Sequence, residues 1–92
     1  MQTIVKKLAK TDADSGWLKL EGTSHKVQVQ LGGPGTVYSI LVSLEEPDDD
    51  FRPAALVDQS SNGGVYSIRD FAYVRFKLVQ GEKALFTVKE CA

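Results

Sequence analysis

The most reactive side chains of the chain are a lone histidine and a lone cysteine. His25 stands at the start of an alternating polar and apolar segment, and Cys91 lies next to the C-terminus. Histidine is the usual general base in nucleophilic catalysis, but it needs a serine or cysteine nucleophile within hydrogen-bond reach. The only cysteine, Cys91, lies far from His25 in the sequence, and no Gly-x-Ser-x-Gly motif is present. We therefore expect a surface or strand-end histidine, an incidental terminal thiol and no catalytic residues.

An acidic run forms the strongest charge cluster. Asp48, Asp49 and Asp50 follow Glu45 and Glu46 within a few residues. Calcium prefers oxygen ligands, but a calcium loop needs spaced acids, a glycine and a distal glutamate, and these are missing here. We expect a solvated loop, with no metal and no cofactor. The alternative reading is electrostatic complementarity with neighbouring copies or with a larger scaffold.

Aromatic side chains offer a different kind of site, because an exposed row of them can stack on sugar rings. Tyr38 alternates with Ile40 and is expected in the core, whereas Trp17 and Tyr73 can lie at the surface. Core or interface packing is the favoured reading for this group. A carbohydrate-binding β-sandwich module is the alternative function.

Period-two alternation marks the elements that must position these residues. It is clearest over 27–31, recurs over 36–44 in a segment apolar on both faces, and returns over 73–79. The turn at 80–83 separates that last segment from 84–89, so we expect a closing antiparallel hairpin there. The pattern predicts an all-β, single-domain antiparallel β-sandwich of about seven to eight strands, either immunoglobulin-like or jelly-roll.

Composition narrows the class of partner. The 92 residues carry a formal charge of −1, so the basic surplus of a typical nucleic-acid binder is absent. No apolar run is long enough to cross a membrane or to act as a secretory leader. We expect one domain over 1–92 that binds neither nucleic acid nor membrane, with 1–15 as an N-terminal arm or an edge strand.

Five segments follow one another along the chain: a Gly-Trp opening, an alternating strand, a Gly-Thr-Val strand, a later glycine-led strand and a Val-Arg strand. These segments are Gly16–Gly22, Val27–Leu31, Gly35–Ile40, Gly64–Ile68 and Tyr73–Phe76. In this order they resemble small β-sandwich virion proteins of tailed bacteriophages, chiefly head-decoration (cement) and tail-associated proteins.

The resemblance implies a non-enzymatic structural protein of the virion, made in the host cytoplasm. It would bind and stabilise a phage capsid or tail assembly through many weak contacts with the major capsid or tail proteins. A homo-oligomer, with a trimer favoured, is expected. The expected interface residues are Ile4, Lys6, Lys7, Trp17, Asp48, Asp49, Asp50 and Arg52.

Overall fold

The computed structural model describes residues 1–46 and 55–91, and the side chains of all of these except 55–60. The described residues form β-strands and no helix, which confirms the predicted all-β class. The eight strands are β1 (Thr3–Ala9), β2 (Leu18–Lys19), β3 (Ser24–Leu31), β4 (Val37–Ser43), β5 (Ala55–Ser60), β6 (Gly64–Arg69), β7 (Tyr73–Gln80) and β8 (Lys83–Glu90).

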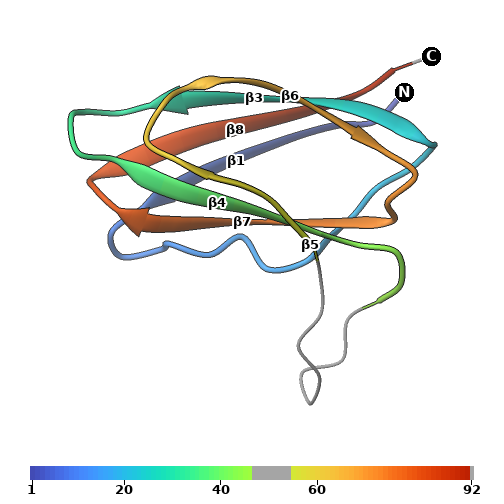
Figure 1. Ribbon diagram of the computed structural model, residues 1–92, viewed down its shortest axis with the longest axis horizontal. Helices are drawn as coiled ribbons and strands as arrows, with labels where there is room; N and C mark the ends of the chain where they lie inside the picture. The colour runs from blue at the N-terminus through green and yellow to red at the C-terminus, as the bar shows by residue number, and fades with distance from the viewer. Residues whose placement is uncertain (47–54, 92) are drawn as a thin grey trace.

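The strands form two antiparallel sheets of four strands each. Sheet A has the order β1-β8-β3-β6, and sheet B has the order β2-β7-β4-β5. Figure 1 shows β8 between β1 and β3, and β4 beside β7. The first strand thus pairs with the eighth, the second with the seventh, the third with the sixth and the fourth with the fifth. This is the jelly-roll arrangement, whereas an immunoglobulin sandwich pairs its first two strands.

Most connections cross from one sheet to the other, and this corrects the predicted closing hairpin. The turn after β7 leads into β8, but β7 lies in sheet B and β8 lies in sheet A. Of the strands that follow one another in sequence, only β4 and β5 pair with each other. A jelly roll has this pattern because its paired strands are far apart in the sequence, so that most successive strands lie in opposite sheets. A short turn therefore marks the end of a strand here without marking a hairpin.

The alternating residues place the core between the sheets. The inward positions of β3, β7 and β8 are buried. The inward residues of β4, Tyr38, Ile40 and Val42, are buried too, and so is Ser39 on its outer face. The segment over 36–44, which is apolar on both faces, contains the central strand β4, which lies between β7 and β5. The buried apolar core consists of Leu8, Leu20, Val27, Val29, Tyr38, Ile40, Val42, Ile68, Val74, Phe76, Leu78, Ala84, Phe86 and Val88.

Four aromatic rings link the two sheets through the middle of this core. Tyr66 from sheet A meets Tyr38 from sheet B edge-on at 6.3 Å, and Tyr38 meets Phe86 of sheet A edge-on at 5.7 Å. Phe86 then stacks on Phe76 of sheet B at 4.5 Å. The rings come alternately from the two layers, so each contact holds one sheet against the other. The buried Tyr38 hydroxyl also donates to the carbonyl oxygen of Asn62 and meets the Tyr66 hydroxyl.

The turn between β7 and β8 depends on Gly81. Its backbone φ of +110° is rarely adopted by residues that have a side chain. A Cβ added to Gly81 would lie 2.7 Å from Cα of the buried Thr36. We expect Gly81→Ala to lower the free energy of unfolding by about 2 kcal/mol or more, through left-handed strain and this clash. Urea unfolding measures the loss. Gly64→Ala is the control, because it meets nothing within 4 Å and should change stability by about 0.5 kcal/mol or less. Equal effects of the two substitutions would contradict this role of the turn.

Candidate functional site

His25 is a core residue and not a surface residue. It lies at the start of β3, as expected, but only 1% of it is exposed, so the predicted surface position is wrong. The odd-numbered residues of β3 face the core, and His25 continues the inward row of Val27 and Val29. Its Nε2 lies 2.6 Å from the carbonyl oxygen of Glu21, which can only accept, so Nε2 carries the proton.

The histidine and the cysteine are not joined into a nucleophile–base pair. Within the described residues, Nδ1 of His25 has no hydrogen-bond partner. The Cys91 thiol contacts the carbonyl oxygen of Lys89 at 3.9 Å. The same part of the chain holds no group of three or more His, Cys, Asp or Glu side chains placed to bind a metal ion. It also contains no helix that is long and apolar enough to cross a membrane.

The outer face of sheet B carries an aromatic and ionic cluster around Arg75. The guanidinium lies 5.8 Å from the centre of the Trp17 ring and forms a two-pronged ion pair with Asp14, with Nε–Oδ1 at 2.8 Å and Nη2–Oδ2 at 2.5 Å. Tyr73 lies two residues before Arg75 on β7, so it faces the same side, and it is half-buried. Trp17 is also half-buried. The predicted exposure of both rings is therefore only partial.

This ion pair gives the fold a small dependence on pH. The hydrogen bonds from Arg75 lower the pKa of the Asp14 carboxyl below its ordinary value, against the raising effect of partial burial. A carboxyl with a lowered pKa stabilises the fold above its unfolded pKa of about 3.9, and this contribution is lost as the pH falls through the folded value. We expect Asp14→Asn to cost about 0.2–1 kcal/mol near neutral pH, because both side chains are partly exposed.

Urea unfolding of wild type and Asp14→Asn between neutral pH and pH 3 checks this dependence. The difference between the two proteins should shrink as the pH falls below about 4. Asp12→Asn is the control, since Asp12 is exposed and forms no side-chain ion pair in the described part of the chain. A stability difference that stays constant down to pH 3 would contradict the role of this ion pair.

The outer face of sheet A presents a regular grid of side chains. Strand pairing fixes the rows across the four strands, because residues opposite one another in an antiparallel pair lie side by side. Read from β1 through β8 and β3 to β6, the rows are Lys7–Leu85–Gln30, Val5–Thr87–Gln28–Val65 and Thr3–Lys89–Lys26–Ser67. Val5 and Val65 are strongly exposed, at 58% and 65%. We call this surface, with Lys83 and Arg69 at its ends, the basic face.

The charged side chains of the basic face all have the same sign. They are Lys7, Lys26, Lys83, Lys89 and Arg69, and each of these residues is exposed. None of the outward positions of β1, β8, β3 and β6, all within the described residues, holds an acidic residue. The chain as a whole carries a net charge of −1, so this face is more positive than the chain as a whole. Such a surface attracts an acidic partner.

One pair on this face opposes folding. Lys26 and Lys89 stand directly opposite each other on β3 and β8. Like charges at such positions destabilise a sheet. The Lys26 ammonium donates to Ser67 Oγ at 2.7 Å, and neither lysine has a carboxylate partner in the described part of the chain. A carboxylate from a bound partner would relieve this repulsion.

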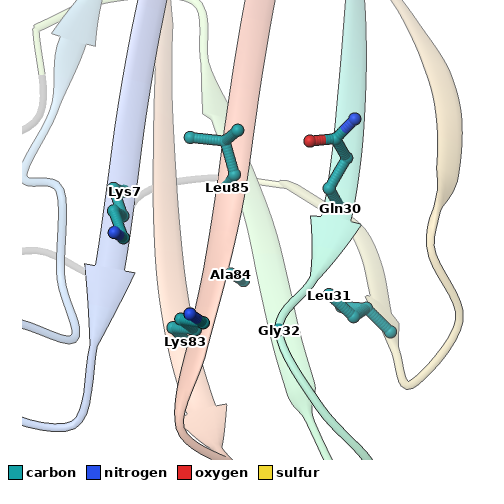
Figure 2. Close-up of a pocket in the computed structure, with 7 residues that line it drawn as sticks. All are labelled: Lys7, Gln30, Leu31, Gly32, Lys83, Ala84 and Leu85. Atoms are coloured by element: carbon teal, nitrogen blue, oxygen red, sulfur yellow. The ribbon is translucent and has the colours of Figure 1, made fainter.

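A hollow of about 270 Å³ lies at one end of the basic face. Figure 2 shows the residues around it, which come from β1, β8, β3 and the turn after β3. Leu85 stands in the middle, with Lys7 opposite it on one side and Gln30 on the other. The lining residues are Lys7, Gln30, Leu31, Gly32, Lys83, Ala84 and Leu85.

The interface residues predicted from the sequence fall in different places. Lys7 belongs to the basic face, whereas Ile4 and Lys6 lie on the inner side of β1, and Ile4 packs against the core. Trp17 belongs to the Arg75 cluster on the other sheet. The segment around Lys6 is the edge strand of sheet A. Asp48, Asp49, Asp50 and Arg52 lie outside the described residues.

Sequence reasoning missed Lys26, Lys83 and Lys89 as parts of a site. The alternation over 27–31 does predict that Lys26 and its even-numbered neighbours face outward. It does not indicate that β8 lies beside β3, and only this pairing gathers the lysines into one surface.

No protein-family model, curated protein or solved structure matches this chain. What the molecule does is therefore inferred from its own sequence, fold and surface.

Proposed function

We propose that this chain is a non-enzymatic structural protein of a tailed-phage particle, which binds the capsid or tail through its basic face. The observation that carries the proposal is the charge of that face, where every ionisable side chain at the outward positions of the described strands is cationic. The largely polar surface is suited to attachment. The phage particle is proposed because the sequence resembles decoration and tail-associated proteins. The major capsid or tail protein is the proposed partner.

Attachment would be multivalent. Each exposed ion pair between the chain and an acidic surface contributes about 0.2–1 kcal/mol, so one copy binds weakly. Binding becomes tight when neighbouring copies, favoured here as a trimer, engage a repeating lattice together. The whole basic face lies on the outer side of sheet A. Exposed valines in the middle row add apolar contact between the charged rows.

An acidic protein surface fits the basic face better than a nucleic acid does. Proteins that bind single-stranded nucleic acids stack the bases on aromatic side chains. No aromatic residue faces outward from the four strands of sheet A, all of which lie in the described part of the chain. Arginine is the commonest reader of base edges, and this face has one, Arg69, at the end of β6. Exposed Val5 and Val65 match an apolar protein patch and have no counterpart in a phosphate backbone.

The experiment is to purify tailed particles that carry the gene for this chain and to measure how much of it remains bound as salt is raised. We expect the chain on the particles at low salt and its release at high salt, because exposed charge pairs are screened. Particles without the chain would contradict the proposal. The purified chain should not be retained on immobilised DNA at the low salt concentration at which it stays on the particles. Retention there would show that the basic face binds nucleic acid and would also contradict the proposal.

The Arg75 cluster favours carbohydrate binding as a second candidate function. A tryptophan ring, a guanidinium and the nearby Tyr73 ring share the outer face of sheet B, and aromatic rings with polar neighbours are suited to sugars. Trp17 is the only tryptophan, so its fluorescence reports this cluster alone. Titration with a panel of glycans should change the emission of wild type and of Lys89→Glu alike. Unchanged emission across the panel would exclude this candidate.

A further inference from the structure

The hollow at the end of the basic face has the features of a site for one acidic side chain. Lys7 and Lys83 supply ammonium groups from β1 and β8, and Gln30 supplies an amide from β3. No acidic residue lines the hollow, and neither lysine has a carboxylate partner in the described part of the chain. A carboxylate placed there would complete charge-assisted hydrogen bonds that the protein itself leaves unmade.

The base of the hollow is apolar. Leu85 lies between Lys7 and Gln30, Ala84 is buried behind it, and Leu31 is half-buried at the edge. In Figure 2 the Lys7 and Lys83 side chains stand beside β8, with Leu85 between Lys7 and Gln30. The volume of about 270 Å³ is near the lower end of ligand pockets, which are about 300–1,000 Å³. It is suited to one or two side chains of a protein partner.

Gly32 leaves room for the side chain of Lys83. Its backbone nitrogen donates to the carbonyl oxygen of Lys83 at 2.9 Å, and a Cβ on Gly32 would lie 2.1 Å from Cγ of Lys83. The aliphatic stem of Lys83 therefore occupies the space that any other residue at position 32 would fill. Because Gly32 has no side chain, the Lys83 stem can lie across the end of the hollow.

We propose that this hollow binds a carboxylate that stands next to an apolar side chain on the partner. The carboxylate lies between the Lys7 and Lys83 ammonium groups, and the apolar group packs on Leu85. This inference rests on the proposed attachment function and names the partner chemistry that the basic face recognises. The carboxylate can come from an acidic residue within the partner or from a chain end.

The test uses the isolated chain and short probes, followed by the backbone amide signals in NMR. The first probe is acetyl-Asp-Leu amide, and the second is acetyl-Leu with a free carboxylate, which stands for a chain end. We expect dissociation constants of about millimolar for such small ligands, with shifts centred on Gly32, Lys83 and Leu85. Acetyl-Asn-Leu amide, which lacks only the charge, should bind at least about tenfold more weakly than acetyl-Asp-Leu amide.

Variants separate the hollow from the rest of the face. Lys83→Gln should weaken binding of the charged probe about tenfold, and Gly32→Ala should weaken it without removing a charge. Lys19→Gln on sheet B is the control and should leave binding unchanged. Equal binding of the charged and uncharged probes, or equal binding to wild type and Lys83→Gln, would overturn the inference. If attachment to particles still responds to Lys89→Glu in that case, the proposed function stands without this site.

Discussion

Lys89→Glu is expected to stabilise the domain and, at the same time, to weaken its attachment to the particle. Lys89 stands directly opposite Lys26, so the substitution replaces a repulsive cross-strand pair with an attractive one. Such an exchange is worth about 0.2–1 kcal/mol of folding stability. The same substitution removes two units of positive charge from the basic face, which should weaken binding to an acidic surface about tenfold for each copy.

Urea unfolding and co-sedimentation with stripped tailed particles measure the two effects separately. Lys19→Glu is the matched control, because it makes the same change of charge at an exposed lysine of sheet B. It should leave attachment close to that of wild type. If Lys89→Glu and Lys19→Glu weakened attachment equally, net charge alone would explain binding and the basic face would lose its special role.

Phe86→Ala is expected to cost about 3–5 kcal/mol, a large part of the stability of a domain of this size. Phe86 is fully buried, stacks on Phe76 at 4.5 Å and meets Tyr38 at 5.7 Å. It stands in sheet A, and both of its ring partners stand in sheet B. Removing the ring leaves a cavity between the two sheets and removes both of its ring contacts across them.

Thermal and urea unfolding, followed by far-ultraviolet circular dichroism, measure this loss. Val79→Ala is the control, because Val79 is 54% exposed and should cost about 1 kcal/mol or less. A loss below about 1 kcal/mol for Phe86→Ala would mean that the sheets are held together elsewhere in the core.

Period-two alternation predicted β3, β4, β7 and β8 and their inward residues, because it depends only on which side of a strand meets the core. It could not predict the connections. The turn at 80–83 has the length and composition of a hairpin turn, yet it carries the chain from sheet B to sheet A. Hairpin and crossing turns share the same local chemistry, and the choice between them is made by long-range pairing, such as that of β1 with β8.

The same limit applies to the candidate site. Lys7 was predicted as a contact residue from a basic N-terminal segment, and the outward direction of Lys26 followed from its alternating strand. Their membership of one surface with Lys83 and Lys89 depends on β8 lying between β1 and β3. His25 shows the opposite case, because its inward position followed from the alternation of Val27 and Val29, and its polar character alone suggested the surface.

Lysine labelling on intact particles tests the central claim most directly. The free chain and the particle-bound chain are acetylated briefly, and the modified lysines are quantified by mass spectrometry. The basic face predicts protection of Lys7, Lys26, Lys83 and Lys89 in the bound chain, with Lys10 and Lys19 still as reactive as in the free chain. Protection of Lys19 while Lys26 and Lys89 remain fully reactive would show that another face makes the attachment.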